Sequence, residues 1–180
     1  MKHKHKFVLS LAVVIKIILL VFALVIVYEL VDFCRFCIKA SAENKYEKSI
    51  EWVTEKSGVD LCSGELVFDK DAHGFHGDGS SLSIYQYAEG TIEEYMEESH
   101  TWKRLPYTDN IDNLLKNYID DNCAECIPNI MEGYYFFYDR HEGCLNPYDD
   151  SDLWEGYSLD CTVTIYDTTT KKLYVYTKDT

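Results

Sequence analysis

The chain has 180 residues, of which 17 are basic, 31 are acidic and seven are cysteine, so its formal net charge is −14 at pH 7. This length leaves room for one globular domain and an appendage. Residues 43–180 alone contain 11 basic and 29 acidic residues, a net charge of −18, which argues against nucleic acid or an anionic membrane surface as a partner.

The amino-terminal segment combines a basic head, residues 1–6, with an apolar stretch of 22 residues from Phe7 to Tyr28. A helix of that length reaches roughly 33 Å, enough to cross the hydrocarbon of a membrane. Basic residues precede the stretch and the flank behind it is mixed in charge, which predicts a cytoplasmic amino terminus. We therefore expect a transmembrane anchor over residues 7–31, with the rest of the chain outside the plasma membrane.

A cleavable signal peptide is the alternative interpretation of this segment. Lys16 would then belong to the basic region, and Ile17–Tyr28 would be the apolar core of the signal. The small residues at 40–42 fit cleavage after Ala42 and secretion, but the charged residues before that site favour an uncleaved anchor. In an anchor, Lys16 either extends toward the cytoplasmic surface or contacts a partner helix as part of a larger membrane assembly.

Behind the anchor, residues 32–57 form a juxtamembrane segment, and the periodicity of 41–58 predicts a helix that ends at Gly58. Residues 64–70 predict a strand that leads into a glycine-rich loop. Residues 81–88 alternate and predict a second strand, with two residues on each face: Leu82 and Ile84 on one, Tyr85 and Tyr87 on the other.

The middle of the chain predicts two helices with a connector between them. A capping-box pattern from Thr91 to Glu94 opens the first helix, which is expected to bury Ile92, Tyr95 and Met96. Residues 102–106 predict an irregular connector that contributes Trp102 and Leu105 to the core. Residues 110–121 predict an amphipathic helix, because five apolar residues form one stripe: Ile111, Leu114, Leu115, Tyr118 and Ile119.

The last third of the chain predicts β structure. Residues 133–141 are aromatic on both faces, as a central strand would be, and a long acidic loop follows them. Residues 157–167 alternate, with Leu159, Cys161, Val163 and Ile165 on one face, and a turn then leads into a strand at 172–177. We therefore expect an α+β domain over residues 58–180, with an antiparallel sheet of about four strands and two or three helices packed on one face.

The loop Asp71–Gly79 is the candidate metal site, because it offers two imidazoles and a carboxylate at His73, His76 and Asp78. Zn²⁺ would accept these three ligands and leave a fourth position open for water or substrate, provided that the glycines let the backbone curl. The alternative is a structured turn in which Asp71 and Asp78 accept backbone N–H groups. No other cofactor is expected, since the chain has no G-x-S-x-G, H-E-x-x-H or phosphate-binding glycine loop.

Asp139, Arg140 and His141 lie where a predicted strand runs out into a loop. A carboxylate beside a histidine is able to orient it as a general base. Adjacent strand residues point to opposite faces, however, so we expect Asp139 to reach another element and Arg140 to pair with an aspartate of a loop. The candidate ligand-binding residues are therefore His73, His76, Asp78, Asp139 and Arg140.

The seven cysteines are an odd number, so at least one thiol is outside any intramolecular disulfide. Export permits disulfides, and the expected ones lie among Cys62, Cys123, Cys126 and Cys144, with Cys161 in the core. Cys34 and Cys37, at the membrane edge, are candidates for a cross-link between two copies of the chain.

Four motifs in order resemble a family of small exported proteins of low-GC Gram-positive bacteria, usually lipoproteins or single-span proteins. They are DAHGFHGDG, W-x-x-L-P at Trp102–Pro106, GYYFFYDRH and IYDTTTKKLYVYTKDT, and the resemblance covers roughly residues 57–180. It implies a location and no chemistry. The sequence thus predicts a membrane-anchored extracytoplasmic binding or interaction module, and the alternative is a metal-assisted hydrolase that uses the Asp71–Gly79 loop.

Overall fold

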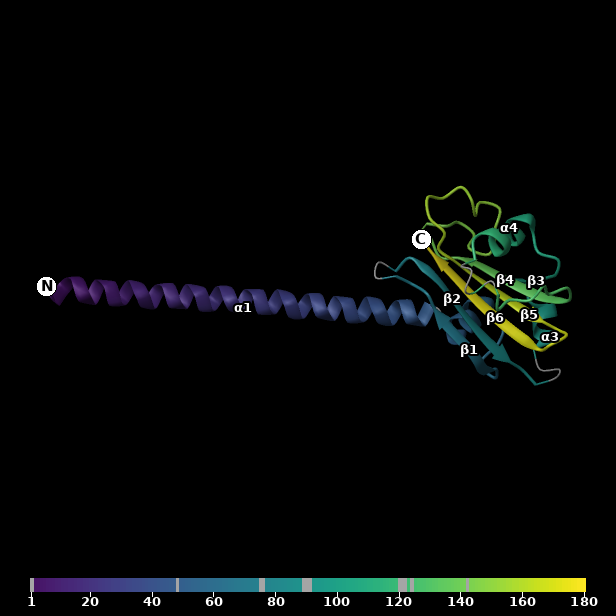
Figure 1. Cartoon of the computed structure of the whole chain (residues 1–180), viewed down its shortest axis with the longest axis horizontal. Helices are drawn as coiled ribbons and strands as arrows, with labels where there is room; N and C mark the ends of the chain where they lie inside the picture. Colours follow the sequence, from purple (N-terminus) through teal and green to yellow (C-terminus); the bar gives the residue numbers. More distant parts are fainter. Residues whose placement is uncertain are drawn as a thin grey trace. The chain divides into compact units, whose positions relative to one another are not determined.

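A computed structural model describes residues 2–47, 49–74, 77–88, 92–119, 123, 125–141 and 143–180. The chain divides into two compact units, Met1–Lys45 and Tyr46–Thr180. Figure 1 shows a single long helix in the first unit and a twisted sheet with short helices in the second.

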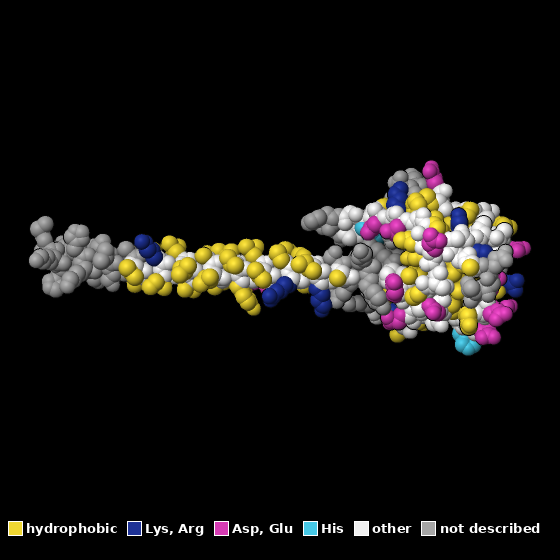
Figure 2. Space-filling model, turned by 90° about the horizontal axis from the view of Figure 1, so that it is seen from below, with side chains coloured by type: hydrophobic (Ala, Val, Ile, Leu, Met, Phe, Trp, Pro, Cys, Tyr) yellow, Lys and Arg dark blue, Asp and Glu magenta, His cyan; other side chains and the backbone are white. Residues whose placement is uncertain are grey.

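Helix α1 (Lys2–Glu47) forms the first unit and ends at the start of the second, so it continues well past the predicted span of 7–31. Within it, Val13–Lys39 has a mean hydropathy of 2.8 and is long and apolar enough to cross a membrane. Its apolar side chains are exposed along the helix, as Figure 2 shows. Lys16 lies within this stretch. The predicted apolar amino-terminal helix is confirmed, and its orientation in a membrane stays a prediction.

The second unit begins with helix α2 (Ile50–Ser57), which is separate from α1. Ser49 caps it, because the Ser49 Oγ accepts a hydrogen bond from the Trp52 N–H at 3.2 Å. Gly58, with φ of 73°, ends it by donating its N–H to the Thr54 carbonyl. The predicted end at Gly58 is confirmed, whereas the single helix predicted over 41–58 is wrong, since a serine cap starts a new helix.

A six-stranded antiparallel sheet forms the centre of the second unit, in the order β1-β2-β6-β5-β4-β3. Its strands are β1 (Glu65–Asp71), β2 (Gly79–Gln86), β3 (Trp102–Arg104), β4 (Gly133–Asp139), β5 (Cys161–Asp167) and β6 (Lys172–Asp179). The expectation of about four strands was too low. The connector at residues 102–106, which was expected to be irregular, contains β3. This three-residue strand pairs with β4 at the edge of the sheet.

The apolar side chains form two clusters, one on each face of the sheet. Residues of α2 and of α3 (Glu93–Glu98) pack with Tyr85 and Phe136 on one face, whereas α4 (Asp109–Asn117) packs with Leu82 and Val163 on the other. The prediction of helices on a single face is therefore wrong. Strands β4 and β6 are apolar at both alternating sets of positions, so each face of the sheet needs a cover. The predicted split of Leu82 and Ile84 from Tyr85 and Tyr87 is confirmed.

Helix α3 only partly follows its prediction. Ile92 and Met96 are buried, but Tyr95 is 64 % exposed, because a helix of six residues presents little more than one turn to the sheet. The helix begins at Glu93 with Ile92 at its N-cap and without a side-chain capping hydrogen bond, so the predicted start is wrong; Thr91 itself lies outside the described residues. Helix α4 is buried at Ile111 and Leu114, as the stripe predicts, while Tyr118 at its end is 46 % exposed.

The acidic loop between β4 and β5 folds over the face that α4 covers. Its Asp150 is only 3 % exposed and accepts hydrogen bonds from the Thr108 hydroxyl and from Lys103 Nζ at 3.2 Å. The Asp150 carbonyl also accepts a bond from Asn110 Nδ2 at 2.7 Å. These contacts fix the loop against the first turn of α4.

Strand β1 is one edge of the sheet. Two of its apolar side chains, Leu66 and Val67, are each 51 % exposed. The pairing of β1 with β2 shifts register between Leu66 and Phe68, which marks a β-bulge in the edge strand.

Candidate functional site

Five strands meet at one end of the sheet, where β1, β4 and β6 finish and β2 and β5 begin. The register places Asp179 opposite Gly79, and Cys161 opposite both Asp139 and Lys178. We call this region the polar sheet end, and it consists of Asp71, His73, Asp139, Arg140, His141, Ser158, Asp160 and Asp179.

His73, a predicted metal ligand, is held between two carboxylates at the polar sheet end. Its Nδ1 contacts the Asp71 carboxylate, its Nε2 lies 2.7 Å from Asp179 Oδ2, and its side chain is 7 % exposed. Asp78 contributes its main-chain carbonyl, which accepts the Gly74 N–H at 2.8 Å and closes the turn. The structured-turn alternative thus has direct support at these residues.

The zinc site at His73, His76 and Asp78 stays a prediction. His76 lies outside the described residues. Among the residues that the structure does describe, no three or more His, Cys, Asp or Glu side chains are grouped to hold a metal ion. Both ring nitrogens of His73 face carboxylates instead of an open coordination position.

Arg140 meets His73 through a shared partner, Asp179. One guanidinium nitrogen, Nη2, donates to the Asp179 carboxylate and to the main-chain carbonyls of Lys178 at 3.1 Å and Cys161 at 3.3 Å. The arginine side chain is 9 % exposed. The structure therefore brings two predicted site residues, His73 and Arg140, together, but as buried side chains that share Asp179 as a partner at the strand ends. Asp179, an acidic partner of Arg140, is the last residue of strand β6, whereas the sequence predicted an aspartate of a loop.

Asp139 contacts His141 directly, contrary to the prediction that it would reach another element. Asp139 Oδ1 accepts the His141 N–H at 2.9 Å and lies 2.7 Å from His141 Nδ1. Strand β4 ends at Asp139, so the alternation of side chains stops there and the chain turns around the aspartate. Asp71 and His73 have the same arrangement, with an N–H contact of 3.0 Å. The repeated Asp-x-His after a strand was the sequence signal for this geometry.

Ser158 completes a serine–histidine–aspartate series that the sequence did not suggest. His141 Nε2 lies 2.7 Å from Ser158 Oγ, on the side of the ring away from Asp139. Asp160 lies on the edge of the pair, with its Oδ2 3.2 Å from Ser158 Oγ and 3.4 Å from His141 Nε2. The His141 side chain is 31 % exposed, so solvent reaches this series.

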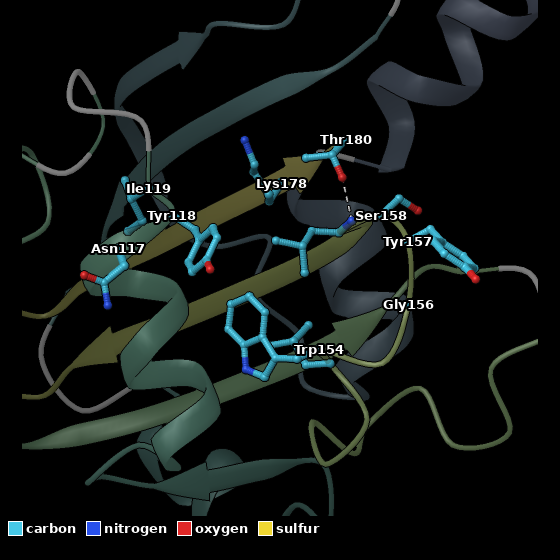
Figure 3. Close-up of a pocket in the computed structure, with 11 residues that line it drawn as sticks. Asn117, Tyr118, Ile119, Trp154, Gly156, Tyr157, Ser158, Lys178 and Thr180 are labelled. Atoms are coloured by element: carbon cyan, nitrogen blue, oxygen red, sulfur yellow. Dashed lines mark hydrogen bonds between the residues drawn. The ribbon is translucent and has the colours of Figure 1, made fainter.

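Ser158 also lines a pocket of about 510 Å³, shown in Figure 3. The pocket lies between the end of α4, the loop before β5 and the end of β6. Tyr118 and Trp154 line it with their rings, whose centroids are 4.8 Å apart, and Lys178 and Thr180 line it from β6 and the residue after it. A hydrogen bond of 3.0 Å from Trp154 Nε1 to Asn110 Oδ1 fixes the indole. This volume falls in the range of small-molecule sites.

A second hollow of about 430 Å³ lies on the His141 side. Asp139 and His141 line it together with acidic residues of the β4–β5 loop, namely Asp149, Asp152 and Glu155. Leu153 and Gly156 line both hollows. The hydrogen bond between Ser158 and His141 therefore joins groups that line two adjacent hollows.

The predicted disulfides among Cys62, Cys123, Cys126 and Cys144 are not formed, since no disulfide joins any of the seven cysteines, all of which the structure describes. Cys62 is exposed beside α2, 3.7 Å from Thr54 Oγ1, whereas Cys123 belongs to the cluster on the opposite face of the sheet. Cys161 is fully buried, as predicted, and burial raises the pKa of its thiol to about 12.

Compared with known protein families, curated proteins and solved structures, the chain matches none. A function for this chain is therefore inferred from the geometry of the second unit.

Proposed function

We propose that this chain is a membrane-anchored, extracytoplasmic binding module that holds a small ring-bearing molecule in the pocket beside Tyr118 and Trp154. The observation that carries the proposal is the composition of this pocket. It combines two aromatic rings 4.8 Å apart with one cationic residue, Lys178, and with the hydroxyls of Ser158 and Thr180. Small-molecule sites typically pair apolar and aromatic walls with a few polar groups that fix orientation.

The pocket is held in shape before a ligand arrives. Asn110 accepts from the Trp154 indole through its Oδ1 and donates to the Asp150 carbonyl through its Nδ2, so one side chain positions the ring and the loop. On the other side, Leu159 N–H donates to Thr180 Oγ1 at 2.6 Å, a bond drawn in Figure 3. A preformed site loses less ordering entropy on binding, which favours affinity.

The contacts of Asp179 with His73 and Arg140 also help to hold this pocket in shape, where it borders the sheet. Asp179 stands between Lys178 and Thr180, two residues that line the pocket. Holding Asp179 from both neighbouring sides therefore fixes the end of β6. In this proposal His73 and Arg140 act on the ligand indirectly, through the position of β6.

The anchor is the apolar part of α1, and we place the amino terminus in the cytoplasm and the second unit outside. If the chain is cut after Ala42, the second unit is secreted. Labelling of intact cells with a membrane-impermeant maleimide tests this orientation in a Cys34→Ser/Cys37→Ser background. Exposed Cys62 should react and buried Cys161 should not; labelling that appears only after cell lysis contradicts the orientation.

Ligand binding is tested with the full chain in lipid nanodiscs and 4-fluorophenylacetate, which has an aromatic ring and a carboxylate. Saturation-transfer difference NMR should show binding by the wild type and by Trp154→Phe, and loss of binding in Trp154→Ala. Tyr95→Ala, which removes an exposed tyrosine from α3 on the opposite face of the sheet, is the matched control and should bind as the wild type does. Equal signals from Trp154→Ala and the wild type would refute the site.

A further inference from the structure

We infer that Ser158, His141 and Asp139 form an acyl-transfer site that hydrolyses small carboxylic esters bound in the Tyr118–Trp154 pocket. The inference rests on the proposed function, because the ester occupies the same pocket, and it adds a reaction and a substrate class.

The three side chains stand in the order that a serine hydrolase requires. Ser158 Oγ lies 2.7 Å from His141 Nε2, and His141 Nδ1 lies 2.7 Å from Asp139 Oδ1. An ionised carboxylate only accepts, so Nδ1 carries the proton in the neutral imidazole and the Nε2 lone pair faces the serine hydroxyl. Asp139 thus orients the His141 ring toward the Ser158 hydroxyl.

Asp139 is itself fixed in place. Its carboxylate accepts the His141 N–H at 2.9 Å, and its own N–H donates to the Pro147 carbonyl at 2.7 Å. With 17 % of its side chain exposed, it is better shielded than His141. Asp139 touches no reacting atom and is a positioning residue.

Asp160 competes for the serine proton but lies farther away, with its Oδ2 3.2 Å from Ser158 Oγ against 2.7 Å for His141 Nε2. The shorter contact favours the histidine as proton acceptor. After proton transfer, the imidazolium has Asp139 on one side and Asp160 on the other, at 3.4 Å from Nε2. Both charges stabilise it.

Backbone donors beside Ser158 are available to a developing oxyanion. Within the part of the chain that the structure describes, the backbone N–H groups of Gly156, Tyr157 and Ser158 donate to no protein acceptor. Lys178 adds a positive charge to the lining of the same pocket. Backbone donors and a cation near a carbonyl oxygen are the elements of an oxyanion hole.

The reaction consumes only the ester and water. Ser158 Oγ attacks the carbonyl carbon while its proton moves to His141 Nε2. The tetrahedral intermediate collapses, the bond from carbon to the alcohol oxygen breaks, and the alcohol leaves with the proton from His141. Water then attacks the acyl-serine with His141 as base, and the carboxylic acid departs as Ser158 regains its proton. The aromatic pair selects esters with a ring in the alcohol or acyl part.

The test uses the full chain in lipid nanodiscs, 4-nitrophenyl acetate as substrate and a fluorophosphonate as covalent label. Mass spectrometry should locate the label on Ser158. Ser158→Ala should lose the label and lower kcat/KM by at least about 100-fold. Ser151→Ala is the matched control, because Ser151 lies in the same loop but bonds to Asp152. It should keep both label and rate. Asp139→Asn should lower kcat/KM, and Asp139→Glu should recover part of it, as a positioning carboxylate requires.

Hydrolysis at the wild-type rate by Ser158→Ala, or a label on no serine or on another serine, would overturn the inference. Binding of 4-fluorophenylacetate by Ser158→Ala shows that this variant is folded and has its pocket. If ligand binds and no serine-dependent hydrolysis occurs, the inference fails and the proposed binding function stands. If neither occurs, both fail.

Discussion

Replacing Asp179 by alanine should destabilise the second unit strongly. The substitution removes the shared partner of Arg140 and His73, whose side chains are only 9 % and 7 % exposed. Removing one member of a buried ion pair costs about 3–5 kcal/mol, because the remaining charge loses an interaction that offset its burial. Asp179 is itself 15 % exposed, so we expect the lower end, about 3 kcal/mol. Asp179→Asn keeps one acceptor for Arg140 and should lose less.

The free energy of unfolding is measured by urea titration of the full chain in nanodiscs, followed by tryptophan fluorescence. Asp112→Ala is the matched control, since Asp112 pairs with Lys116 at 2.6 Å but their side chains are 43 % and 68 % exposed. An exposed i,i+4 pair contributes only about 0.3–0.5 kcal/mol. If Asp179→Ala lowers the free energy of unfolding no more than Asp112→Ala does, the buried contacts of Asp179 do not stabilise the second unit. The proposal that they fix the end of β6 would then be refuted.

Three further predictions concern buried and exposed polar groups. Asp150→Ala should cost about 2 kcal/mol in the same titration, because it leaves the Thr108 hydroxyl and Lys103 without the acceptor that they share. Burial raises the pKa of the Cys161 thiol from 9 to about 12, so above pH 9 the unfolded chain loses a proton that the folded chain keeps. The free energy of unfolding should therefore fall by about 1.4 kcal/mol per pH unit above pH 9. The fall per pH unit should be smaller in Cys161→Ala. Cys34 and Cys37 are exposed three residues apart on α1, so mild oxidation in membranes should yield a disulfide-linked dimer on non-reducing gels, and a dimer that persists in the double serine variant would contradict this.

The faces of the strands were predictable because alternation is a local property. Leu82 and Tyr85 fall on opposite faces whatever the strand pairs with, and the end of α2 follows from one glycine. The three-residue strand β3 left no periodic signal, since its position depends on pairing with β4. The covering of both faces was not predictable for another reason: β4 and β6 are apolar on both sides, and such strands do not show which helix covers which side.

The candidate site was predictable only in part. His73 and Arg140 were singled out by residue type, but their common partner, Asp179, lies on a strand that reaches them only through the order of the sheet. Ser158 lies 17 residues from His141 on an irregular loop, and no spacing rule connects the two. Alternation predicts no contact between Asp139 and His141, but it holds only within a strand, and β4 ends at Asp139.

The bulge in β1 bears on whether copies of this chain are able to pair through this edge of the sheet. Leu66 and Val67 give this edge an apolar character that would invite a strand from a neighbouring molecule. The register shift beside them interrupts the regular spacing of donors and acceptors at this point, which works against a second chain continuing the ladder there. Anchored proteins diffuse in two dimensions at high local density, where an unprotected edge would seed aggregates. If the chain is anchored as proposed, the irregular edge would work against such aggregation.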